Sequence, residues 1–174
     1  MEKKIMTIDV NVILQNDGGP FSSTEVIAAL SHIERLSRDA AVYAIGRIAS
    51  DLELPPTIQD AAFWRIYTEP NGLFWIDSIE LGSIDIKGKI MTAAITAILT
   101  ATVGASINEG WKQTKSHQHI VAALPKIENY IIESFQSLMD RERPSTDRNI
   151  TIDRVAVIRD ERAQRIKISI RIRR

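Results

Sequence analysis

The sequence contains no cysteine, only three histidines and no glycine-rich phosphate loop. The absence of cysteine excludes disulfides, a thiol nucleophile and thiolate metal sites. Three histidines leave little material for a zinc enzyme, and no Ser/His/Asp spacing is present. We therefore expect no enzymatic activity, no metal and no cofactor. The enzymatic alternative is a small hydrolase that uses Asp77, Glu80 or His119.

Three acids, Asp77, Glu80 and Asp85, cluster on two predicted extended segments. Carboxylates so arranged are a candidate cation site. Exposed strand positions explain the same three residues equally well.

Charge is unevenly distributed, although the net charge is zero. Residues 148–174 carry nine lysines and arginines against three acids, a net charge of +6. Residues 1–147 carry 13 against 19, a net charge of −6. This split predicts a basic surface that meets phosphate, nucleic acid or anionic lipid. The alternative is a basic face that docks on an acidic face of the same protein.

Hydrophobic periodicity predicts an α+β fold. The first strand does not read as a signal peptide, because Asp9 and Asn11 interrupt its apolar run. Ser22 to Glu25 offer N-caps for the long helix that follows. Trp64, Trp75 and Trp111 are candidate interface anchors, with core packing favoured for Trp64. Predicted strands cover 8–14, 73–81, 84–89, 150–158 and 163–173, and predicted helices cover 24–51, 58–67 and 122–139.

Residues 90–107 form an uncharged run, IMTAAITAILTATVGASI. As one helix it spans about 27 Å, close to the hydrocarbon thickness of a bilayer. Lysines and Trp111 flank it, as interfacial anchors do. It is therefore a candidate single transmembrane span, and the alternative is a soluble helix buried in the core. One of its stripes suits close helix packing or a pore lining: Thr92, Thr96, Thr100 and Gly104.

A topological consequence separates the two readings of this run. A single span would place residues 1–89 and 108–174 on opposite sides of a membrane. The first strand could then not pair with the C-terminal hairpin, whereas with a buried helix the terminal strands can share one sheet.

The last predicted strand is the best candidate for ligand binding. Isoleucines alternate there with cations, so that one face is apolar and the other basic. The cations recur at about 6.6–7 Å, near the repeat of a nucleic-acid backbone. The alternative is a solvated or acid-paired face. The candidate ligand-binding residues are Arg165, Lys167, Arg171 and Arg173.

The layout divides into an N-terminal α/β region (1–89), the candidate span or central helix (90–107), and a C-terminal helix with the basic hairpin (108–174). In layout only, it resembles small bacterial phage-defence membrane effectors, including the Hailong-type membrane effector. That resemblance implies a homo-oligomer in the bacterial inner membrane, and a nucleotide or oligonucleotide signal sets the state of this oligomer.

The resulting hypothesis is a non-enzymatic, channel-like antiviral effector gated by an anionic ligand. The runner-up is a soluble, cytoplasmic α+β interaction module that binds a nucleic acid or an acidic protein partner.

Overall fold

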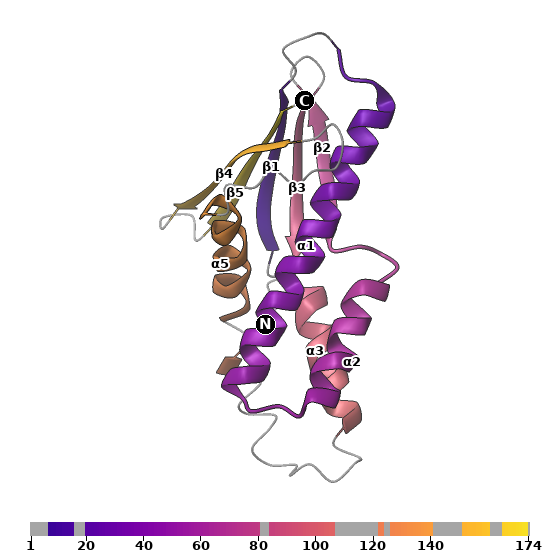
Figure 1. Cartoon of the computed structure of the whole chain (residues 1–174), viewed down its shortest axis with the longest axis vertical. Helices are drawn as coiled ribbons and strands as arrows, with labels where there is room; N and C mark the ends of the chain where they lie inside the picture. Colours follow the sequence, from indigo (N-terminus) through magenta and orange to yellow (C-terminus); the bar gives the residue numbers. More distant parts are fainter. Residues whose placement is uncertain are drawn as a thin grey trace, which may run out of the picture.

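The computed structural model describes residues 7–15, 20–80, 84–106, 122–123, 126–140, 151–160 and 165–173. The protein is an α+β protein, as the periodicity predicts. Its elements are β1 (Thr7–Gln15), α1 (Ser23–Asp51), α2 (Pro56–Thr68), β2 (Phe74–Glu80), β3 (Asp85–Met91), α3 (Thr92–Ser106), α5 (Lys126–Asp140), β4 (Thr151–Asp160) and β5 (Arg165–Arg173) (Figure 1).

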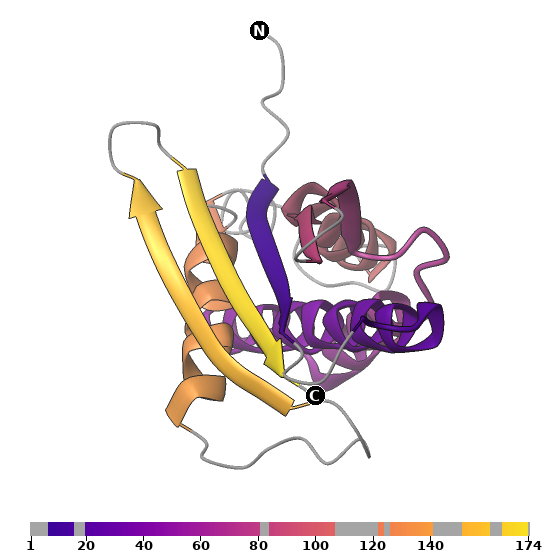
Figure 2. The ribbon, with the colours of Figure 1, turned by 90° about the horizontal axis from the view of Figure 1, so that it is seen from above.

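The strands form one five-stranded sheet in the order β2-β3-β1-β5-β4. β1 and β5 pair in parallel, and the other neighbours pair antiparallel. Figure 2 shows β4, β5 and β1 side by side, so strands from both ends of the chain share the sheet. This is the arrangement expected if residues 90–107 do not separate the two ends.

The core lies between one face of the sheet and the helices. Ile8, Val10, Val12 and Leu14 of β1 alternate toward this side, which we call the core face, and all four are buried. They share one apolar cluster with residues of α1 and α5, and these two helices pack on each other. The opposite side, the outer face, carries Asp9, Asn11 and Ile13 of β1.

The long helix α1 begins where the sequence offers a cap. The Ser22 Oγ accepts a hydrogen bond from the Glu25 backbone N–H at 3.2 Å, and the Glu25 carboxylate accepts one from the Ser22 N–H at 2.7 Å. This reciprocal pair satisfies two backbone donors that a helix start leaves unpaired.

The uncharged run is divided between two elements, so the prediction of one continuous helix over 90–107 is wrong. Ile90 and Met91 end β3, where Ile90 pairs with Ile8 and Met91 with Thr7. The helix α3 begins only at Thr92 and has 15 residues. Within the described ranges, no helix is both long and apolar enough to cross a membrane.

In its described part, α3 matches the buried-helix alternative. Ile95 and Leu99 are fully buried in the same core cluster as β1. These two bulky side chains of the run thus pack on the protein itself. An uncharged run is compatible both with a lipid bilayer and with a protein core. Because its first two residues pair in the sheet, the helix is shorter than the run.

The expected core position of Trp64 is also wrong, because its side chain is 69% exposed. The buried side of α2 carries Ile58, Ala62 and Ile66, at a spacing of four residues. Trp64 lies between these positions and therefore on the opposite, exposed side of α2.

Candidate functional site

A groove of about 520 Å³ lies where the end of α2, the turn before β2 and one side of α3 meet. Trp75, at its edge, is 52% exposed. The groove is lined by Arg65, Thr68, Glu69, Pro70, Asn71, Gly72, Trp75, Met91, Ala94, Ala97, Ile98 and Ala101.

The groove exists because one face of α3 carries small side chains. Ala94, Ala97 and Ala101 recur at spacings of three and four, so they share a face. Alanine ends at Cβ, and these residues leave the space between α2 and Trp75 unfilled. The neighbouring Ile98 is largely buried and gives the groove an apolar floor.

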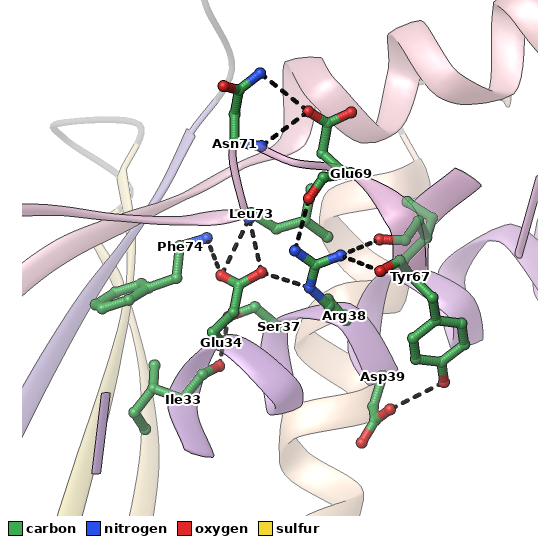
Figure 3. A network of polar contacts seen from close by, with 11 residues as sticks. Ile33, Glu34, Ser37, Arg38, Asp39, Tyr67, Glu69, Asn71, Leu73 and Phe74 are labelled. Carbon is green, nitrogen blue, oxygen red and sulfur yellow. Dashed lines mark hydrogen bonds and ion pairs between the residues drawn. The ribbon is translucent and has the colours of Figure 1, made fainter. Parts of the chain in front are cut away.

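Two charged residues of α1 hold the wall of the groove in place (Figure 3). The Glu34 carboxylate accepts hydrogen bonds from the backbone N–H of Leu73 at 3.1 Å and of Phe74 at 2.8 Å. It also pairs with the Nε of Arg38 at 2.6 Å. Glu34 thereby fixes the start of β2 against α1.

Arg38 holds the end of α2 against α1 in a similar way. Its guanidinium donates hydrogen bonds to the backbone carbonyls of Ile66, Tyr67 at 2.9 Å and Glu69 at 2.8 Å. A helix leaves its last carbonyls without internal partners, and a cation there also suits the helix dipole. We call Glu34 and Arg38 the clamp, since together they tie both ends of the 69–73 turn to α1.

Gly72 allows this turn to approach the clamp. Its φ is +71°, a region that residues with a Cβ adopt at a cost. A Cβ at this position would also lie 3.2 Å from an oxygen of the Glu34 carboxylate. The turn is therefore built around a glycine for two separate reasons.

The polar groups at the groove differ in how many hydrogen-bond or ion-pair partners they have. The Glu69 Oε1 accepts hydrogen bonds from the Asn71 backbone N–H at 3.3 Å and from its Nδ2 at 3.1 Å. Arg65, in contrast, has no hydrogen bond or ion pair to any residue in the described ranges. Its guanidinium is a charged donor in an otherwise mostly apolar groove, which suits an amphipathic ligand that carries an acid.

A second polar cluster joins α1 to α5 away from the groove. The Asp51 carboxylate accepts a hydrogen bond from the Tyr130 hydroxyl at 2.7 Å and pairs with Lys126 at 3.1 Å. The Tyr130 hydrogen bond, followed by Lys126, lowers the pKa of Asp51 below its ordinary value of 3.8. The guanidinium of Arg47 lies 5.4 Å from the Tyr130 ring centroid. This cluster anchors the first turn of α5.

The candidate ligand residues of the last strand all lie on β5, between β1 and β4. In register, Lys167 lies beside Asp9 and Arg165 beside Asp160. Acids thus flank two of the four cations, as the acid-paired alternative requires. The other two have no acid in register: Arg171 lies beside Ile13 and Arg154, and Arg173 beside Gln15 and Thr151.

The candidate stripe on α3 does not share one environment. Thr92 is buried, Thr96 is half-buried and Thr100 is exposed. Gly104 lies near the end of α3. Their role in helix packing or in a pore stays a prediction.

Two of the candidate cation-site acids form ion pairs across the β2–β3 hairpin. Asp77 pairs with Lys89 at 2.7 Å, and Glu80 pairs with Lys87. In the described ranges, no group of three or more acids, histidines or cysteines is placed to hold a metal ion. His119 and Trp111 lie outside the described residues.

Sequence reasoning missed the groove itself. Two sequence features could have indicated it. They are the alanines at 94, 97 and 101, and Trp75, a candidate interface anchor that lies at the groove. Neither signal indicates that α2 lies opposite, because that contact is made by the tertiary structure.

No protein-family model, curated protein or solved structure matches this chain.

Proposed function

We propose that this protein is a binding module without catalytic activity. Its groove takes a short segment of a partner protein that combines apolar side chains with a carboxylate. The observation that carries the proposal is the half-exposed Trp75 beside the alanines of α3. Arg65, which has no ion pair to a described residue, lines the same groove.

The shape and chemistry of the groove support this ligand class. A volume of about 520 Å³ is in the usual range for specific binding sites. Tryptophan and arginine are the residues most often found as energetic anchors at protein interfaces. An apolar side chain would rest on Ile98 and the alanines, and a carboxylate would pair with Arg65 in a bidentate geometry.

The clamp supports binding by fixing the groove before the ligand arrives. Because Glu34 and Arg38 hold the 69–73 turn, little conformational entropy remains to be lost there on binding.

The proposal is tested with synthetic eight-residue peptides in which leucine or phenylalanine alternates with glutamate. A second series replaces glutamate by lysine. We expect the acidic series to bind and to shift the NMR signals of the Trp75 indole and of Ala97. We expect Trp75→Ala to weaken binding about thirtyfold, the effect of losing about 2 kcal/mol from an anchor.

The chain offers a matched control. Trp64 is also an exposed tryptophan, but it does not line the groove. Trp64→Ala should leave binding unchanged, and Arg65→Glu should shift the preference from the acidic to the lysine series. Equal losses for both tryptophan variants, or signal shifts confined to β5, would refute the groove as the site.

A second ligand class is favoured by the register of the C-terminal hairpin. Arg171 and Arg154 occupy neighbouring positions on β5 and β4, and Arg171 has no ion pair to a described residue. Two arginines at neighbouring register positions concentrate positive charge, which attracts a phosphate. We propose that a nucleotide or oligonucleotide binds along Arg165, Lys167, Arg171 and Arg173.

This second proposal is tested by fluorescence anisotropy with a labelled twelve-residue oligothymidine at low and physiological salt. Arg171→Glu should abolish binding, and higher salt should weaken it in the wild type. Arg65→Glu serves as the control, because it reverses an equal charge outside the hairpin. If both variants lose binding equally, the interaction is non-specific and the hairpin site is wrong.

A further inference from the structure

Among the strands that the structure describes, β2 and β4 stand at the two edges of the sheet, so each pairs with a described strand on only one side. Proteins usually protect such edges with proline, charged side chains or β-bulges. β2 contains no proline, and its two acids form ion pairs with Lys87 and Lys89. It has one register irregularity, between Ile76 and Ser78. Its isoleucines are open to solvent: Ile76 is 45% exposed and Ile79 is 44% exposed.

Only the first part of this edge is closed within the molecule. The Phe74 N–H donates to Glu34 of α1 and so points away from β3. Since alternate N–H groups along a strand point to the same side, the N–H of Ile76 also points outward. From Ile76 to Glu80, no hydrogen bond to a described residue covers the outer edge of the strand.

The neighbouring helix extends the exposed apolar surface. Ile27 lies seven residues before Glu34 and therefore on the same side of α1, the side from which α1 contacts β2. Its side chain is 63% exposed. Figure 1 shows the N-terminal half of α1 running beside β2. Exposed apolar side chains that gather along a free strand edge indicate an interface.

We infer that β2 of one copy pairs with β4 of the next, so that the sheet continues from molecule to molecule. The strand directions fit this contact. β2 runs parallel to β1 and β5, whereas β4 runs antiparallel to β5. A second copy in the same orientation therefore presents its β4 antiparallel to β2, with the core face on the same side in both molecules.

The residue types along the two edges also match in register. Val157 and Val155 of β4 lie in the same rows of the sheet as Val10 and Val12, on the core face. Continuing these rows places Ile76 opposite Val157 of the second copy and Ile79 opposite its Val155. The same continuation places Glu80 at the register position opposite Arg154 of the second copy. Apolar and opposite-charge pairs across neighbouring strands stabilise a sheet.

Charge favours this contact over pairing of β2 with another β2. Two copies of β2 would bring Asp77 and Glu80 close to the same acids of the second copy. Pairing of β2 with β4 instead joins the chain region with a net charge of −6 to the region with +6. Contacts between unlike surfaces do not close after two copies, so they generate rings or open chains.

The inference predicts a reciprocal charge experiment, read by sedimentation velocity across a wide concentration range. The wild type should associate increasingly with concentration. Glu80→Arg places arginine opposite arginine, and Arg154→Glu places glutamate opposite glutamate. Each variant alone should therefore associate about tenfold more weakly, because like charges directly opposite destabilise a strand pair.

An equimolar mixture of the two variants should regain wild-type association. One contact in the mixture joins the unchanged Glu80 to the unchanged Arg154, and the other joins the introduced arginine to the introduced glutamate. Ile76→Pro removes an outward N–H without removing a β2–β3 hydrogen bond, and it should block association. Circular dichroism confirms that each variant folds.

Three outcomes overturn the inference: a wild type that stays monomeric, Arg154→Glu associating like the wild type, or a mixture that does not recover. The second outcome indicates pairing of β2 with β2. The contact goes beyond the proposed peptide binding, and the two are separable. Arg65→Glu should change peptide preference and leave association unchanged, whereas the charge reversals at the edges should change association and leave peptide binding unchanged.

Discussion

Loss of the clamp should both destabilise the protein and loosen the groove. Arg38→Met keeps the length of the side chain but removes the guanidinium. Three backbone carbonyls at the end of α2 then lose their donor, and Glu34 loses its cation. The side chain of Arg38 is only 16% exposed, so water replaces these partners incompletely.

The magnitude follows from these contacts. A hydrogen bond to a charged group contributes about 1.5–3 kcal/mol, and the carbonyls regain part of this from solvent. We expect a loss of about 3 kcal/mol in the free energy of unfolding. For a chain of this length, that loss lowers Tm by about 6–12 °C. Glu34→Gln, which keeps the shape and removes the charge, should cost about half as much.

The assays are thermal unfolding and amide hydrogen exchange. The Leu73 and Phe74 amides, which donate to Glu34, should exchange faster in both variants. The double variant should lose less stability than the two single losses added together, because both residues belong to one network. The control is Arg65→Met, which removes an exposed arginine that has no partner among the described residues.

The reasoning is refuted if Arg38→Met lowers Tm no more than Arg65→Met does, or if the two losses are simply additive. The first result would mean that the turn is held by its own conformation and that the clamp contributes little. The second would mean that Glu34 and Arg38 act independently and do not form one network.

Gly72→Ala should destabilise by about 1–2 kcal/mol in chemical denaturation, because of its positive φ and the approach to Glu34. Gly46→Ala is its counterpart inside α1, where a Cβ meets only side chains at 3.7 Å, and it should stabilise by up to about 1 kcal/mol. Asp51 has a lowered pKa, so its contribution is present above its ordinary value of 3.8 and is lost as the pH falls through the folded value. Asp51→Asn should therefore reduce stability at neutral pH and flatten its fall in acid, measured as Tm against pH. An unchanged acid limb would contradict the role of its hydrogen bond from Tyr130.

Much of the fold could be predicted from local sequence patterns. The alternation in β1 and in the C-terminal hairpin is a property of neighbouring residues, and so is the cap at Ser22. These signals need no knowledge of the rest of the chain. They placed the strands and helices within a few residues of their observed bounds and predicted the α+β class.

The uncharged run shows a limit of prediction from local patterns. Nothing local marks the boundary between Met91 and Thr92, because residues on both sides are apolar or small. The pairing of Ile90 with Ile8 decides it, and this contact joins segments more than 80 positions apart. In the same way, Trp64 and Trp75 look alike in the sequence, and only the packing of α2 and α3 distinguishes the exposed one from the one at the groove.

The sequence by itself therefore determined most of the segments that form strands and helices, because amphipathic periodicity and capping act between near neighbours. It also determined the charge difference between the two ends of the chain. Only the tertiary structure decided that β1 lies beside β5, that the clamp holds the groove, and that β2 and β4 stand at the edges of the sheet. These features depend on contacts between distant segments, and their energies are set by packing and register that no local pattern records.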